Sequence, residues 1–250
     1  MKRLLLGPRA VLDALRSVPQ QISVVYHDPT GDPTAREAAR VARERNVRSE
    51  ERGPAELDAL ARGAAHAGVL AIAGDYPYAT LEDVLARSAP APLLVALDQI
   101  TDPHNFGAIV RSAVAFGADG VLTLKDRAAP VTAVVVRAAA GATELVAIAR
   151  VTNLARTLEQ LADAGMQVLG LDSGGEDDIA ALPFPHAGRV LVIGSEGEGL
   201  RRLVRERCDT CARVPMRGAV QSLNASVAAA IALYECARAR SALDSTEASS

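Results

Sequence analysis

Residues 194–200, GSEGEGL, form a glycine-rich segment that also carries two carboxylates. The apolar run RVLVI precedes it and the basic stretch RRLVRERC follows it. A glycine-rich turn between a strand and a helix often binds phosphate, because free backbone N–H groups point at the anion. Glu196 and Glu198 would repel a phosphate. The segment therefore predicts a ligand that accepts both close backbone contact and nearby negative charge.

A second group of polar residues lies in LDQITDPHNFGAIVRSA, residues 97–113, where an apolar strand gives way to a predicted helix. Asn105 stands at the start of that helix, and Arg111 lies away from its apolar face. Taken singly, Asn105 is an ordinary helix cap and Arg111 an ordinary solvated side chain. The two could converge only on a ligand that lies around the start of the helix.

A third group lies in RVPMRGAVQSLNASVA, residues 213–228, which leads into the last predicted helix. Ser222 and Asn224 could each cap that helix. Glu198, four residues before Arg202, has an equally simple interpretation as one partner of a helical salt bridge. The three groups carry more information together, because each follows a predicted strand. Ligands of parallel sheets bind at the carboxyl ends of the strands.

Apolar strands alternate with helical segments from residue 93 onward. This pattern predicts an α/β fold with a mainly parallel sheet and helices on both faces. The predicted strands cover residues 93–98, 120–124, 144–149, 167–172, 189–194 and 211–216. A separate small α/β domain is expected before them. The expected boundaries are a small domain over 1–78, a linker over 79–92, a catalytic domain over 93–240 and a disordered tail over 241–250.

One ligand that suits the 194–200 segment is S-adenosylmethionine, which carries a positive sulfonium and no phosphate. A dinucleotide is the alternative that this fold pattern suggests first. The glycines of the segment run G-x-x-G-x-G, which reverses the dinucleotide fingerprint, and they follow the fifth predicted strand instead of the first. No Gly-Lys-Ser/Thr phosphate loop occurs either. A Rossmann dehydrogenase is therefore disfavoured.

Composition narrows the class of protein further. The net charge is −3, aromatic residues make up 3% and Trp is absent, so neither bulk charge nor an aromatic platform predicts RNA binding. No apolar run approaches the roughly 20 residues of a membrane span, and no signal sequence is evident, so we expect a cytoplasmic protein. Cys208 and Cys211 lack two further ligands at zinc spacing, so we expect no metal.

The three segments LDQITDPHNFGAIVRSA, VIGSEGEGLRRLVRERCD and VPMRGAVQSLNASVAAAIALYE resemble, in order and spacing, the signature motifs of the SpoU/TrmH family. These are trefoil-knot RNA 2′-O-ribose methyltransferases. KDRAAPVT, AAAGATELV and RVTNLARTLEQL resemble the bacterial branch that methylates a guanosine ribose in 23S rRNA, and GPRAVLDAL and AHAGVLAIA more loosely resemble its RNA-recruiting domain. The resemblance implies a C-terminal trefoil knot, S-adenosylmethionine as cofactor, an RNA substrate and a homodimer.

The resemblance also implies roles for individual residues. It places cofactor binding on Gly194, Val214 and Leu223, largely through backbone and apolar contacts. Arg111 is the candidate for activating the ribose 2′-hydroxyl, since the family offers no His or Lys base. The implied active-site set is Asn105, Arg111, Glu198, Ser222 and Asn224.

Three alternatives to a 23S rRNA methyltransferase stay open. They are a tRNA ribose methyltransferase, an antibiotic-resistance rRNA methyltransferase and a non-catalytic RNA-binding module. The short acidic tail LDSTEASS disfavours the first, and the retained Arg111 and Asn224 disfavour the last. The small domain carries closely spaced arginines that predict either a phosphate-binding face or a solvated helix. They are Arg36, Arg40, Arg43, Arg45, Arg48 and Arg52.

Overall fold

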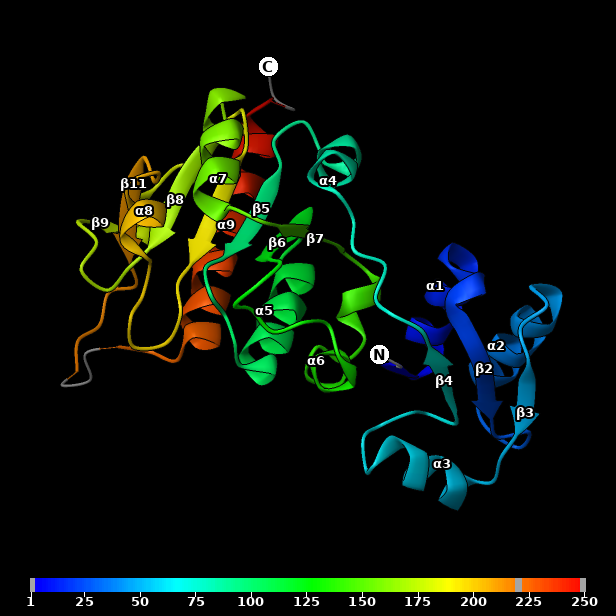
Figure 1. Ribbon diagram of the computed structural model, residues 1–250. Helices are drawn as coiled ribbons and strands as arrows, with labels where there is room; N and C mark the ends of the chain where they lie inside the picture. Colours follow the sequence, from blue (N-terminus) through cyan, green and yellow to red (C-terminus); the bar gives the residue numbers. More distant parts are fainter. Residues whose placement is uncertain (1–2, 219–221, 248–250) are drawn as a thin grey trace. The chain divides into compact units, whose positions relative to one another are not determined.

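The computed structural model describes residues 3–218 and 222–247, and the chain forms two compact units (Figure 1). The small unit comprises residues 1–77 and 130–145. The large unit comprises residues 78–129 and 146–250. The segment 130–145 thus belongs to the small unit, although the sequence pattern places it inside the expected catalytic domain. The chain passes between the units three times as a result.

The small unit is built on a four-stranded sheet in the order β1-β4-β2-β3. β4 pairs antiparallel with β1 and β2, and β3 is a short edge strand parallel to β2. The amphipathic helices α1 and α2 bury their apolar residues, and alanine dominates the buried side of α2. The elements are β1 (Arg3–Leu6), α1 (Pro8–Ser17), η1 (Pro19–Gln21), β2 (Ile22–His27), α2 (Pro33–Glu44), β3 (Ser49–Glu51), α3 (Pro54–Ala61), β4 (Val69–Ala73), α6 (Ala133–Ala138) and η2 (Ala142–Glu144).

Buried polar contacts hold the segment 130–145 in the small unit. Arg3 on β1 is buried, and its guanidinium forms an ion pair with Glu144 in η2. The Tyr76 hydroxyl donates to the backbone oxygen of Thr143 at 2.7 Å. Burial raises the pKa of Glu144 despite the arginine beside it. Because both charges are out of water, loss of either partner would leave the other uncompensated.

The large unit contains a seven-stranded sheet in the order β7-β6-β5-β10-β8-β11-β9, with every neighbouring pair parallel. This confirms the predicted parallel α/β fold. β5, β6 and β10 are buried along their whole length, which explains why their sequences are apolar apart from Thr123 in β6 and Arg189 at the start of β10. The strands are β5 (Leu93–Leu97), β6 (Gly120–Leu124), β7 (Ala147–Val151), β8 (Gln167–Leu171), β9 (Asp177–Asp178), β10 (Arg189–Ile193) and β11 (Thr210–Arg213).

Helices cover both faces of this sheet (Figure 1). α5 and α9 pack against each other and against the sheet, whereas α4, α7 and α8 contribute to the apolar core with side chains that include Val84, Leu158 and Val204. No helix among the described residues combines the length and apolarity needed to cross a bilayer. The remaining elements are α4 (Leu81–Arg87), α5 (Pro103–Ala115), α7 (Leu154–Asp163), η3 (Ile179–Ala181), α8 (Arg202–Arg205) and α9 (Ala225–Glu247).

Two segments differ from the expectation. Residues 79–92, expected to be a linker, include α4, whose Val84 is fully buried against the sheet. A Cβ at Gly120, where β6 begins, would lie 2.3 Å from Val84 Cγ1, so this close packing requires a glycine. The expected disordered tail is helical as far as Glu247, because residues 241–247 contain neither Gly nor Pro to end α9. Residues 248–250 lie outside the described residues.

Candidate active site

A cavity of about 430 Å³ opens at the carboxyl ends of β8, β10 and β11. Its walls come from residues 171–173, 193–199, 214, 216 and 222–225, together with Ala228. These stretches lie far apart in the sequence. They meet because parallel strands end at one edge of the sheet. The second and third sequence motifs therefore supply most of the described cavity wall, whereas residues 97–113 of the first motif do not line it.

The loop after β10 folds back on itself at Gly194. The backbone N–H of Ser195 donates to the oxygen of Gly199 at 3.1 Å, and the N–H of Gly199 donates to the oxygen of Ser195 at 3.0 Å. A Cβ at Gly194 would lie 2.2 Å from the carbonyl carbon of Gly199. Only glycine fits there. The loop's own closure therefore requires Gly194, independently of any approach by a ligand.

A buried charge pair fixes this loop to the neighbouring strand. Asp98 directly follows β5 and is fully buried. Its carboxylate accepts hydrogen bonds from the backbone N–H of Arg201 at 2.9 Å and from Arg201 Nε at 2.7 Å. Because the guanidinium and the backbone N–H of Arg201 both donate to Asp98, the end of the loop is held at this carboxylate. Sequence analysis did not single out either residue, although a carboxylate directly after the apolar strand LLVAL was a visible signal.

Asn105, Glu196 and Asn224 form a polar cluster beside the cavity. Asn105 Nδ2 donates to Glu196 Oε1 at 2.8 Å, and Asn224 Nδ2 donates to Asn105 Oδ1 at 3.1 Å. Asn224 Nδ2 also donates to Glu196 Oε1. One carboxylate therefore joins all three sequence motifs. Glu196 was visible as one of two carboxylates in its loop, but the sequence alone did not separate it from Glu198.

The capping interpretations of the two asparagines have different outcomes. The N-cap of α5 is Asp102, whose carboxylate accepts from the N–H of His104 at 2.9 Å, and Asn105 lies one turn further on. The interpretation of Asn105 as a cap is therefore wrong. Asn224 does cap α9, because its Oδ1 accepts from the N–H of Ser226 at 2.9 Å. Asn224 thus combines a structural contact with its place in the cluster.

The other predicted active-site residues lie outside this cluster. Glu198 lines the cavity but is exposed and has no partner among residues 3–218 and 222–247. Its predicted salt bridge is absent because α8 begins only at Arg202, which pairs with Glu206 at 2.6 Å. Ser222 lines the cavity and is exposed. Arg111 is exposed on α5, does not line the cavity and has no partner in the described part of the chain.

The predicted cofactor residues Gly194, Val214 and Leu223 all line the cavity. Apolar side chains and backbone make up much of its wall, which suits a flat heterocycle. Acidic residues also line it, and the described lining contains no Lys or Arg. This chemistry fits a cationic ligand without phosphate, such as S-adenosylmethionine, and opposes a dinucleotide. Asp172, which follows β8, was not predicted; its carboxylate pairs with Arg205.

The cysteine pair behaves as part of the core. A Cβ built at Gly170 would lie 2.9 Å from Cys211 Sγ and 3.1 Å from Cys208 Sγ, so the two thiols pack over the same glycine. Burial raises the pKa of Cys208 to about 12 and also raises that of Cys211. In the described part of the chain, no three His, Cys, Asp or Glu side chains gather to hold a metal ion.

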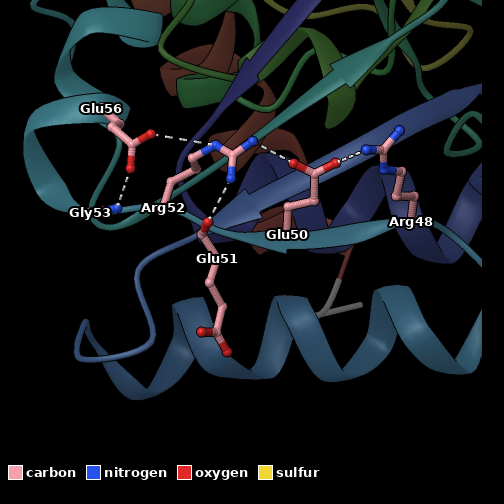
Figure 2. Close-up of polar contacts among 6 residues, drawn as sticks. All are labelled: Arg48, Glu50, Glu51, Arg52, Gly53 and Glu56. Carbon is pink, nitrogen blue, oxygen red and sulfur yellow. Dashed lines mark hydrogen bonds and ion pairs between the residues drawn. The ribbon is translucent and has the colours of Figure 1, made fainter.

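Three of the six arginines of the predicted phosphate-binding face, Arg40, Arg48 and Arg52, form ion pairs with carboxylates. Figure 2 shows a network at the edge strand β3, in which Glu50 lies between Arg48 and Arg52. Arg52 also lies 3.8 Å from Glu56, and its guanidinium stacks over the Tyr26 ring at 5.2 Å. On α2, Arg40 pairs with Glu44. Of the other three, Arg43 donates to the backbone oxygen of Ala39 at 3.2 Å and Arg36 interacts electrostatically with Asp32. The side chain of Arg45 forms no ion pair or hydrogen bond among the described residues.

Comparison with known proteins places this geometry in a family. The SpoU rRNA Methylase family model matches residues 92–234, and a model described as RNA 2′-O ribose methyltransferase substrate binding matches residues 4–79. A tRNA/rRNA methyltransferase of Mycolicibacterium gilvum is 46% identical over 95% of this chain and 76% of its own length.

Two solved structures share the fold over nearly the whole chain. The SpoU methyltransferase AviRb from Streptomyces viridochromogenes, in complex with AdoMet, is 27% identical with a TM-score of 0.78, over 96% of this chain and 91% of its own. The AdoMet-bound rRNA methyltransferase from Sinorhizobium meliloti is 26% identical with a TM-score of 0.78, over 95% and 87%. The chain therefore belongs to the SpoU rRNA methylase family and is an RNA methyltransferase of the SpoU/TrmH type.

Proposed function

We propose that the chain transfers a methyl group from S-adenosylmethionine to the ribose 2′-hydroxyl of a guanosine in 23S rRNA, in the cytoplasm. The observation that carries the cofactor assignment is the cavity at the strand ends, whose described lining holds carboxylates and no cation. The ribosomal target is supported by the resemblance of KDRAAPVT and RVTNLARTLEQL to the 23S rRNA branch. The rRNA methyltransferase from Sinorhizobium meliloti, similar over nearly all of the chain, points the same way.

Gly194, Val214 and Leu223 would hold the cofactor, which supplies an electrophilic methyl group on its sulfonium. The polar cluster would fix the three loops relative to one another, since Glu196 accepts hydrogen bonds from both asparagines. We therefore assign the acidic positioning role to Glu196 in place of Glu198. Ser222 and Glu198 remain at the cavity wall, where they can meet the substrate.

Arg111 would activate the ribose hydroxyl. A guanidinium close to the hydroxyl favours its deprotonated form, because it stabilises the developing negative charge. The side chain is exposed and has no carboxylate partner among the described residues, so its charge is available to a substrate. Since Arg111 does not line the cavity of its own chain, a second subunit would have to bring an arginine and a cavity together.

The proposed homodimer has a candidate surface on α9. Val227, Ile231 and Tyr234 are apolar residues at helical spacing, and they are 47%, 36% and 52% exposed. α9 packs beside α5, the helix that carries Arg111. A second copy of the chain on this face would bury Val227, Ile231 and Tyr234 close to α5 and α9. The trefoil knot at the carboxyl end of the large unit also remains a prediction from the family resemblance.

A tRNA target is the second candidate, because the relative from Mycolicibacterium gilvum is named for both tRNA and rRNA. Ribose methylation mapped across rRNA and tRNA from a strain lacking the gene separates the two. We expect one 2′-O-methylguanosine to disappear from 23S rRNA and to return with the wild-type gene but not with Arg111→Ala. Loss confined to tRNA would favour the second candidate, and unchanged methylation in both RNAs would overturn the proposal.

A further inference from the structure

The loop after β6 carries two cations at the same sheet edge as the cavity. Lys125 and Arg127 follow the last residue of β6, and all strands of this sheet are parallel. β5 alone separates β6 from β10, whose carboxyl end forms part of the cavity wall. Two strand spacings amount to about 10 Å. Phosphates next to a nucleotide bound at the cavity could therefore reach this loop.

Backbone contacts hold the loop in place at both ends. The N–H of Lys125 donates to the oxygen of Val151 at 2.9 Å, and Arg150 donates to the oxygen of Lys125. At the other end, the N–H of Ala129 donates to the oxygen of Ile100 at 2.9 Å. Ile100 belongs to the loop that joins β5 to α5, the helix of Asn105. The cation-bearing loop is therefore linked directly to the loop that leads into the polar cluster.

The charged side chains of this loop are not used by the fold. Lys125 and Arg127 are exposed, and neither has a partner within the described ranges. Arg127 has φ 58°, and Gln99 in the adjacent loop has the same value. A left-handed conformation is costly for a residue other than glycine and is concentrated at functional sites. Asp126, also exposed, is the carboxylate between the two cations.

We propose that Lys125 and Arg127 contact backbone phosphates of the RNA strand that flanks the target nucleotide. The inference rests on the proposed function, because it takes the cavity as the place of methyl transfer. Two exposed cations without structural partners, on a loop held by its backbone, suit a polyanion that passes along the sheet edge. Such contacts position the RNA without reading its sequence.

The test compares RNA binding by the full chain and its variants. Lys125→Gln/Arg127→Asn removes both charges, and Asn tolerates positive φ, so the loop conformation is kept. With an unmodified 23S rRNA transcript, we expect about tenfold weaker binding and a salt slope smaller by about 1.4–1.8, since two phosphate contacts are lost. Asp126→Asn should instead tighten binding. Single-turnover transfer at saturating RNA should stay at the wild-type rate.

Arg87→Ala is the matched control. Arg87 is also exposed and forms no ion pair or hydrogen bond among the described residues, although Asp83 is its electrostatic neighbour on the same helix. It lies on α4, whose Val84 packs at Gly120 on the amino edge of the sheet. This control should keep wild-type affinity and salt slope. Equal binding by the double variant and the control would overturn the inference and leave the proposed function intact. An unaltered chain that binds no RNA would overturn both.

Discussion

Around β3 of the small unit, arginines lie within ion-pair distance of carboxylates, whereas Arg111, Lys125 and Arg127 of the large unit have no partner among the described residues. Arg48 and Arg52 already share a carboxylate partner in Glu50, and this ion-pair network lies at the edge strand β3 (Figure 2). The second set remains charged and open to solvent. Clustered arginines in a sequence therefore identify a binding surface only when the positions of the neighbouring carboxylates are also known.

The largest expected effect concerns Arg111. Arg111→Ala should lower single-turnover methyl transfer at least about 100-fold, because the variant lacks the charge that stabilises the ionised hydroxyl. Affinity for S-adenosylhomocysteine, measured by calorimetry, should stay within a few-fold, since Arg111 does not line the cavity. Near wild-type transfer by this variant would show that an open cation in the large unit need not be functional.

Substitution of the two carboxylates of the 194–200 loop should have very different effects on methyl transfer. Glu196→Ala leaves the amide N–H of the buried Asn105 without its acceptor, which costs about 1.5–3 kcal/mol, or about 10–100-fold in transfer if the cluster positions the loops. Glu198→Ala removes a side chain with no partner in the described chain and serves as the matched control. A larger loss for Glu198→Ala would restore the assignment made from sequence.

Arg201 tests whether a paired arginine in the large unit is structural. Arg201→Met leaves the fully buried Asp98 uncompensated and should lower the free energy of unfolding by about 2–4 kcal/mol, since the Arg201 side chain is 38% exposed. Arg202→Met removes an exposed pair with Glu206 and should cost no more than about 0.5 kcal/mol. Urea unfolding measures both. Equal losses would mean that Asp98 does not anchor the loop.

The smallest effects should come from the network at β3. Arg48→Ala breaks an exposed pair with Glu50 and should change stability by less than about 1 kcal/mol. The salt slope of rRNA binding should not change, because the arginine already has a carboxylate partner. A slope smaller by about one would reveal a phosphate contact and remove the contrast between the two units.

Much of the large unit follows from local sequence. The strands LLVAL and RVLVI are apolar, apart from Arg189, because both faces are covered, and a parallel sheet then brings the strand ends together. Gly194, Val214 and Leu223 line the cavity, and their role in cofactor binding stays a prediction. These predictions need only the alternation of strands and helices and the positions of the motifs.

Other features depend on contacts between residues far apart in the sequence, which motif spacing does not predict. Glu196 and Glu198 are equivalent in sequence, and only the positions of Asn105 and Asn224 distinguish them. The segment 130–145 joins the small unit through Arg3, more than a hundred residues away. Separating this segment from that unit would expose a buried face, so a chain lacking residues 1–77 is a poor test of the large unit alone.

Methyl transfer by the purified full chain is the direct test of 2′-O-methylation of a guanosine in 23S rRNA. The chain is incubated with S-adenosylmethionine labelled in the methyl group and an unmodified 23S rRNA transcript, and the RNA is then hydrolysed in alkali. A 2′-O-methyl group protects the adjacent phosphodiester linkage from alkali. We therefore expect label in alkali-resistant dinucleotides that contain 2′-O-methylguanosine. Label recovered on a base, or no transfer to the rRNA, would contradict it.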